Sequence, residues 1–222
     1  FPTALNFTVP QVRDLKFRTV EEIFEKYDFD GLEVDFLRSS PYFMPGTETQ
    51  NAHLLTGLLQ RIRKHLNARG AERGRPIRLA VRVNESLSSC RQDGFDVRAW
   101  IEQDLVDMIA MGSGVMDIEV EEFQQLAADH GVYVYPCLYG WPSGYGKFTP
   151  EMCRALATNY WFQGADGIYT FNWFVHNYVH RPERAARFEE QFDWLREIND
   201  PDAMRGKDKR YVADRGGPSI WY

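Results

Sequence analysis

Three acidic side chains lie in or just after two neighbouring predicted strands, where they could carry out acid–base chemistry. Residues 30–37, DGLEVDFL, read as an Asp-Gly turn and a strand in which Glu33 and Asp35 alternate. Both acids therefore point to one face, with Asp35 nearer the carboxyl end. Glu85 follows the next predicted strand, IRLAVRV at 77–83. Glycoside hydrolysis uses two carboxyl groups, one as nucleophile or base and one as acid for the leaving oxygen. We predict Asp35 in the first role and Glu85 in the second, with a solvated loop residue or a helix cap as the alternative for Glu85.

The two strand acids need partners, because burying an unpaired carboxylate costs several kcal/mol. The alternative to a catalytic role is therefore a buried ion pair. Glu33 could pair with Arg82 or Arg78. Asp35 could pair with Arg38, but residues at the carboxyl end of a barrel strand usually face the ligand, which favours Asp35 as the site residue. Glu33, one layer deeper, is expected to be a supporting charge that holds an arginine in place, and Arg82 could hold a carboxylate at the mouth or bind an acidic sugar.

Aromatic and amide side chains gather just after the predicted strands. Planar rings stack well on the apolar C–H faces of sugars, while polar side chains hydrogen-bond the hydroxyl groups. The predicted substrate-binding residues are Glu33, Arg38, Arg82, Asn84, Tyr139, Trp141, Asn172, Trp173 and His176.

These residues are positioned by an alternation of predicted helices and strands. Helices are expected over 19–27, 52–70, 96–105, 118–131, 149–164 and 182–198, and strands over 31–37, 77–83, 106–112, 132–139 and 167–174. Such an alternation with largely apolar strands is typical of a parallel sheet flanked by helices. Since no glycine-rich nucleotide loop occurs and the polar residues follow strand ends, we predict an α/β fold of the (β/α)8 TIM-barrel type.

The predicted barrel is incomplete. Five strands and a possible sixth at 4–8 can be counted, where a closed barrel needs eight. We therefore expect the last five to six strand-helix units in a catalytic domain over 1–198, followed by an irregular extension over 199–222. The open sheet edges would need covering by a missing N-terminal barrel segment or by a second copy in a homodimer.

Composition excludes several other classes of function. The formal net charge is -6 and no basic block alternates with aromatics, so no nucleic acid is expected as a partner. No apolar run approaches the ~20 residues that span a bilayer. The three cysteines form no CxxC pair, and His53, His65 and His130 fall on predicted helices, so neither a metal nor a cofactor is expected. The chain begins at Phe1 without a visible leader, although polysaccharide degradation would suggest an exported protein.

The stretches LNFTVPQVRDLKF and YDFDGLEVDFLRSSPYF resemble the bacterial glycosyl-hydrolase-like barrel proteins of the family-ten-like group. The match runs through residues 10–14, 27–28 and 30–32 to Asp35, with Arg38 beyond it, and the later AVRVNES and PEMCRALATNYWFQGADGIYTFNWF fit the same group. The resemblance implies a catalytic barrel that acts on a polysaccharide or glycoconjugate. It also implies that Asp35 occupies the position of the family's catalytic carboxylate.

The same stretch is similar to the chitinase-type signature DGxDxDxE but departs from it at two positions. Leu37 replaces the terminal glutamate, which is the proton donor in that group, and Glu33 stands where an aspartate would be. The proton donor must then come from elsewhere, and Glu85 is the prediction. Two alternatives to a glycoside hydrolase remain open, a non-catalytic carbohydrate-binding barrel and an inactive portion of a larger enzyme.

Overall fold

Five parallel strands form the centre of the protein, as seen in a computed structural model that describes residues 4–38, 40–112, 114–139, 149–171, 173, 190 and 192–212. Within these residues the strands are β1 (Gly31–Asp35), β2 (Arg78–Val83), β3 (Met108–Met111), β4 (Tyr133–Tyr139) and β5 (Tyr169–Phe171). The helices are α1 (Pro10–Lys26), α2 (Glu48–Arg73), α3 (Leu87–Gln92), α4 (Val97–Glu102), α5 (Val120–Ala127) and α6 (Pro150–Phe162).

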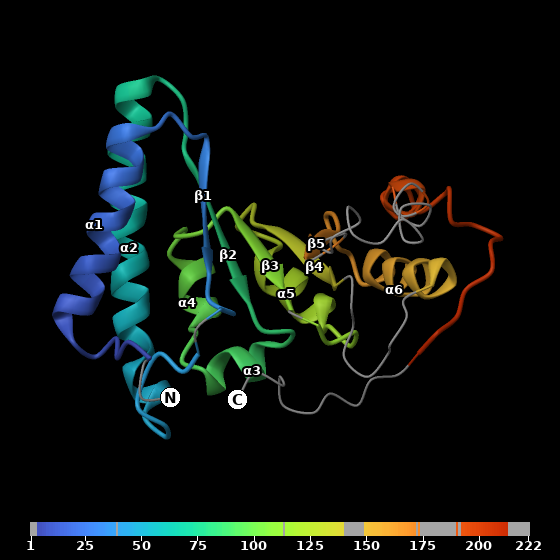
Figure 1. Ribbon diagram of the computed structural model, residues 1–222, viewed down its shortest axis with the longest axis horizontal. Coiled ribbons are helices and arrows are strands. Elements are labelled where there is room, and N and C mark those ends of the chain that lie inside the picture. Colours follow the sequence, from blue (N-terminus) through green and yellow to red (C-terminus); the bar gives the residue numbers. More distant parts are fainter. Residues whose placement is uncertain are drawn as a thin grey trace, which may run out of the picture.

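Each strand pairs in parallel with its neighbour in the sequence, so the sheet order is β1-β2-β3-β4-β5 (Figure 1). The sheet is curled, so that its first and last strands approach each other. The Tyr169 hydroxyl on β5 donates to Glu33 Oε1 on β1 over 3.0 Å, although these strands lie at opposite ends of the sheet order. Helices connect the strands, as parallel pairing requires. The prediction of an incomplete TIM-type barrel is confirmed.

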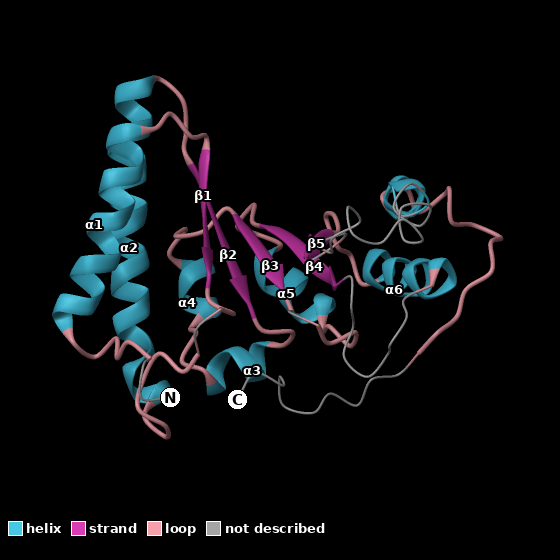
Figure 2. Cartoon of the chain, viewed as in Figure 1, coloured by secondary structure: helices cyan, strands magenta, loops and turns pink. Residues whose placement is uncertain are grey.

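The two faces of the sheet differ in chemistry. Side chains on the outer face are apolar, and Val81, Ile109 and Val134 are 0% exposed against the helical layer. Figure 2 shows the strands as one curved layer, with α1 and α2 standing beside β1. The inner face carries charged and aromatic side chains and holds the candidate site. This division is a direct result of strand alternation.

The helix boundaries differ from the expected ones where turn chemistry dominates. Residues 4–8 form a turn instead of a strand, so that prediction is wrong; Asn6 Oδ1 accepts hydrogen bonds from the Thr8 backbone N–H and hydroxyl, which closes an Asx turn. The helix expected over 19–27 begins much earlier, at Pro10, because proline suits the first turn of a helix. The helix expected to end at Gly70 runs to Arg73 and is capped by Gly74 in the left-handed conformation.

An aromatic cluster fixes the carboxyl end of β1. Phe36 follows the strand, is 2% exposed, and stacks on the Trp100 ring at 5.2 Å. Trp100 donates from Nε1 to Thr56 Oγ1 over 3.0 Å, and the Tyr42 hydroxyl donates to the Phe36 carbonyl over 3.1 Å. The loop after β1 therefore begins at a tightly packed residue, Phe36. This packing fixes the backbone next to Asp35, which immediately precedes Phe36.

Residues 192–198 are helical, as expected for the end of the helix predicted over 182–198, and residues 199–212 contain no helix or strand; both stretches pack on α6. Arg154 on α6 pairs with Glu197 over 3.0 Å, and the Trp161 indole donates to the Ile198 carbonyl over 2.8 Å. The Arg210 backbone N–H donates to the Glu151 carbonyl over 3.0 Å. These contacts join the described end of the chain to the barrel.

Asp107, just before β3, joins three groups at the amino end of the sheet. It accepts from the Leu79 N–H at 2.7 Å, from Arg63 at 2.5 Å and from Arg78 at 2.9 Å. Burial raises the pKa of this carboxyl, but the hydrogen bonds from Leu79, Arg63 and Arg78 outweigh it, so the pKa is lowered overall. This stabilisation is fully present above the unfolded-state pKa of about 4 and is lost as the pH falls through the lower folded-state pKa.

We expect Asp107→Asn to lower the free energy of unfolding by about 1–3 kcal/mol at pH 7, because a charged acceptor is lost. The difference from the wild type should shrink as the pH falls below about 4. Urea unfolding at pH 7 and at pH 3 measures both values. The matched control is Asp129→Asn, an exposed residue outside the sheet. An equal loss at the two pH values would contradict a role for the Asp107 charge.

Candidate functional site

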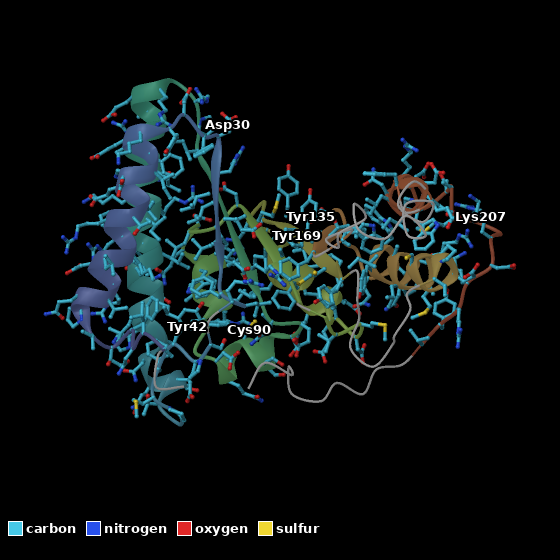
Figure 3. All side chains as sticks on the ribbon, viewed as in Figure 1. Asp30, Tyr42, Cys90, Tyr135, Tyr169 and Lys207 are labelled. Carbon is cyan, nitrogen blue, oxygen red and sulfur yellow. The ribbon has the colours of Figure 1, made fainter. Side chains whose placement is uncertain are left out.

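The inner face of the curled sheet brings together acids, arginines and a group of aromatic rings. Strand alternation and the register place these side chains on it: Glu33, Asp35, Arg78, Ala80, Arg82, Met108, Ala110, Tyr133, Tyr135, Cys137, Tyr139, Tyr169 and Phe171. Figure 3 shows the direction of the sheet, with Asp30 at the amino end of β1 and Tyr42 and Cys90 beyond the carboxyl ends of β1 and β2. Ligands of parallel barrels bind at the carboxyl ends.

Asp35 and Arg82 form an ion pair at the carboxyl end of this face. Asp35 Oδ2 lies 3.0 Å from Arg82 Nη1, and the side chains are 24% and 1% exposed. Asp35 Oδ1 also accepts from the Leu37 N–H over 2.9 Å. The predicted catalytic carboxylate is thus oriented on both oxygens while it keeps partial contact with solvent.

Gly112 completes the environment of Arg82. Its carbonyl accepts from Arg82 Nε over 3.3 Å, and its own N–H donates to the Val83 carbonyl over 2.8 Å. The residue has a φ of +89°, which favours glycine, and a Cβ there would lie 2.9 Å from Ile118 Cδ1. The turn after β3 therefore needs a glycine to present its carbonyl to the arginine.

The alternative ion pairs considered for Glu33 do not form among the described residues. Arg82 holds the carboxylate at the mouth, Asp35, as one expectation had it, because the register places Asp35 directly opposite Arg82, whereas Glu33 is opposite Ala80. Arg78 pairs with Asp107 at 2.9 Å. The partner of Glu33 is the Tyr169 hydroxyl, and the pKa of Tyr169 is raised by its burial and by this hydrogen bond.

Aromatic rings from β4 and β5 surround the ion pair. The Phe171 ring lies over the Arg82 guanidinium, 3.6 Å from centroid to Cζ, and the Tyr139 ring stacks on Phe171 at 5.8 Å and 25°. Tyr135, labelled near Tyr169 in Figure 3, packs over Gly167, where a Cβ would approach its Cε1 to 2.2 Å. Tyr139 is one of the predicted substrate contacts, whereas Tyr135, Tyr169 and Phe171 are not among them. Their alternate spacing in VYVYPCLY and GIYTF was the available signal.

The inner face contains one thiol, whose surroundings do not favour nucleophilic chemistry. Cys137 is 1% exposed. Burial raises the pKa of its thiol to about 12, although the nearby Arg82 charge acts in the opposite direction. Since the thiolate is the nucleophile, this cysteine is neutral at physiological pH.

The second predicted acid, Glu85, is held by a short helix that sequence analysis did not predict. The side chain of Ser86 caps α3 by accepting from the Ser89 N–H over 3.1 Å. The Ser89 hydroxyl donates to Glu85 Oε1 over 2.8 Å. The Glu85 carbonyl accepts from the Glu119 N–H over 3.0 Å, which joins this loop to the start of α5.

Asn84, a predicted substrate contact, is 8% exposed, and its side chain holds the same loop in place by hydrogen bonds. Its Nδ2 donates to Asp93 Oδ2 over 2.7 Å and to the Ser89 carbonyl over 3.1 Å. Trp173 is 9% exposed and belongs to the apolar core. Three further predicted contacts, Trp141, Asn172 and His176, lie outside the described residues.

The part of the chain that the structure describes contains no group of three or more His, Cys, Asp or Glu side chains arranged to hold a metal ion. Within the same ranges, no helix is long and apolar enough to cross a membrane.

Comparisons with known proteins give similarity at the level of the fold. No protein-family model and no curated protein sequence matches the chain. Among solved structures, the chain is similar to a glycoside hydrolase family 18 N-acetylglucosaminidase from Paenibacillus barengoltzii, with 13% identity and a TM-score of 0.55 over 86% of this chain and 77% of that one. It is also similar to chitinase ChiA74 from Bacillus thuringiensis, with 16% identity and a TM-score of 0.42, but spans only 25% of that chain.

A third similar structure is a 2,3-dimethylmalate lyase of the PEP mutase/isocitrate lyase superfamily, with 16% identity and a TM-score of 0.41 over 90% of this chain and 60% of that one. At such identities only the fold is shared. The class that the strands define is an incomplete α/β barrel, and a glycoside hydrolase of family 18 has the same type of fold. No match supports the family-ten-like group suggested by the sequence motifs.

Proposed function

We propose that the protein hydrolyses glycosidic bonds in a polysaccharide or glycoconjugate, with Asp35 as nucleophile or base and Glu85 as proton donor. The observation that carries the proposal is the position of Asp35. This carboxylate lies at the carboxyl end of a barrel strand, keeps 24% of its side-chain surface exposed, and is oriented by Arg82 and the Leu37 N–H beside stacked aromatic rings.

The roles of the two acids follow from the chemistry of the glycosidic bond. Asp35 attacks the anomeric carbon, or removes a proton from the attacking water, while Glu85 protonates the leaving oxygen. Tyr139 and Phe171 offer ring faces to the sugar C–H groups. The Ser89 hydroxyl, 2.8 Å from Glu85 Oε1, fixes the orientation of the acid.

The second candidate function is a non-catalytic carbohydrate-binding barrel. The closed ion pair between Asp35 and Arg82 favours it, since a structural pair needs no reaction to explain it. The presence of Leu37 where chitinase-type barrels have the proton donor favours it as well. This candidate predicts binding of glycans without turnover.

The experiment that tests the proposal is the leaving-group dependence of Glu85→Gln. After a polysaccharide screen for release of reducing ends, the variant should hydrolyse the natural glycan about 10²–10⁴-fold more slowly, because general acid catalysis is lost. A dinitrophenyl glycoside of the same sugar should lose much less rate, since its leaving group needs no proton.

The matched control is Glu72→Gln, an exposed residue of α2, which should leave both rates unchanged. Equal losses on the two substrates would contradict the role of Glu85 as the acid. A wild-type protein that binds a glycan but hydrolyses neither substrate would favour the binding barrel.

A further inference from the structure

We propose that the carboxyl end of the inner face, at Arg38 and Phe171, binds the acidic group of a sugar, so that the glycan bound by this protein is anionic. The inference rests on the proposed function only in taking the ligand to be a glycan. It adds the charge of the substrate, which the two catalytic carboxylates do not specify.

Arg38 is an exposed cation that forms no salt bridge with any carboxylate of the described ranges. Arg38 lies three residues beyond Asp35 in the sequence, and its guanidinium lies 5.9 Å from the centroid of the Phe171 ring. A contact with a ring face uses none of the N–H groups of the guanidinium. Its planar fork of donors matches a carboxylate or sulfate in geometry and charge.

Arg82 supplies a second cation on the same ring. Its guanidinium lies 3.6 Å from the Phe171 centroid and is fully buried. Nη1 donates to Asp35 and Nε to the Gly112 carbonyl, whereas Nη2 has no hydrogen-bond partner among the described residues. The guanidinium is buried next to the Cys137 side chain, so Arg82 contributes positive charge to the site, and Arg38 makes the direct contact with the acidic group.

The nearby carboxylates are already engaged. Both oxygens of Asp35 accept hydrogen bonds, from Arg82 and from the Leu37 N–H. Glu33 accepts from the Tyr169 hydroxyl, two residues closer to the amino end of β1. Among the described residues, Arg38 is therefore left without a counter-ion at the carboxyl end, while the Glu33 charge disfavours an anion deeper in the inner face.

The aromatic pair makes a sugar acid a better ligand than a free inorganic anion. Tyr139 and Phe171 stack at 5.8 Å and are both partly exposed. A pyranose ring can lie against such a pair while its acidic substituent reaches Arg38. A uronate carboxylate and a sulfate ester share this chemistry, and binding of matched acidic and sulfated oligosaccharides distinguishes them.

The test compares a galacturonate hexasaccharide with its methyl-esterified form by isothermal titration calorimetry, with a sulfated oligosaccharide of equal length as a further arm. We expect at least about ten-fold tighter binding of the free acid than of the ester, because the ester removes the charge and keeps the ring. Arg38→Gln should abolish the preference. Arg98→Gln, an exposed arginine on α4, should retain it.

Equal affinity for acid and ester, or a preference that survives Arg38→Gln, would overturn the proposal. Arg38-dependent binding of the sulfated sugar alone would support it and identify the acidic group as a sulfate. Arg38-dependent binding without hydrolysis would sustain the anionic site and contradict the hydrolase. Hydrolysis of a neutral glycan that is bound as tightly as its acidic counterpart would sustain the hydrolase and contradict the site.

Discussion

Arg82→Met is expected to lower the free energy of unfolding by about 3–5 kcal/mol, the cost of removing one partner of a buried ion pair. The guanidinium is 0% exposed and lies between Asp35, the Gly112 carbonyl and the Phe171 ring. Methionine fills much of the same space but leaves the Asp35 carboxylate facing an apolar surface without a counter-ion. Since Asp35 is 24% exposed and keeps some water, the value should fall near the lower end of this range. Urea unfolding at pH 7 measures it.

A double variant separates the charge from the packing. Asp35→Leu combined with Arg82→Met removes both charges and should recover most of the lost stability, because apolar replacements of a buried ion pair are often neutral or stabilising. Arg98→Met, on the exposed face of α4, serves as the control and should stay within about 0.5 kcal/mol of the wild type. A single Arg82→Met variant as stable as the wild type would show that the pair contributes nothing to the fold.

The fold could be predicted from the sequence because strand and helix periods are local properties. All five described strands fall inside the predicted ranges, and α6 begins at Pro150 with a Thr149 cap, as its sequence indicates. Parallel pairing then follows from the helices between the strands. The turn at residues 4–8 was misjudged because the Asn6 side-chain oxygen accepts a hydrogen bond from the Thr8 N–H, which competes with strand formation.

The site was predicted less completely, because it depends on relations between strands. Sequence alternation placed Glu33 and Asp35 on one face, but it could not give the register that sets Arg82 opposite Asp35. The curl of the sheet was equally hidden, and it is the curl that brings Tyr169 to Glu33 and Phe171 to Arg82. The prediction that a partner segment or a second copy covers the open sheet edges stays a prediction.

Asp35→Asn should lower turnover by at least about 10⁴-fold, more than the loss expected for a general acid, because amide nitrogen and oxygen neither attack the anomeric carbon nor remove a proton from water. Glycan affinity should stay within a few-fold of the wild type. The fold should survive with a lower free energy of unfolding, since the amide oxygen can still accept from Arg82 Nη1, 3.0 Å from the present carboxylate, while the buried guanidinium loses its counter-ion. Reducing-end release, calorimetric binding and thermal unfolding measure the three properties on one sample.

Glu33→Gln is the matched control, because it changes a carboxylate on the same strand and the same face. Glu33 lies one layer deeper and accepts a hydrogen bond from Tyr169, which a glutamine oxygen can also accept. Turnover by Glu33→Gln should fall less than about ten-fold, because the substitution removes a distant charge and not a reacting group. If Asp35→Asn and Glu33→Gln lose activity equally, Asp35 is not the reacting carboxylate. If neither changes glycan binding and the wild type shows no turnover, the Asp35–Arg82 pair is structural, and the aromatic inner face serves recognition alone.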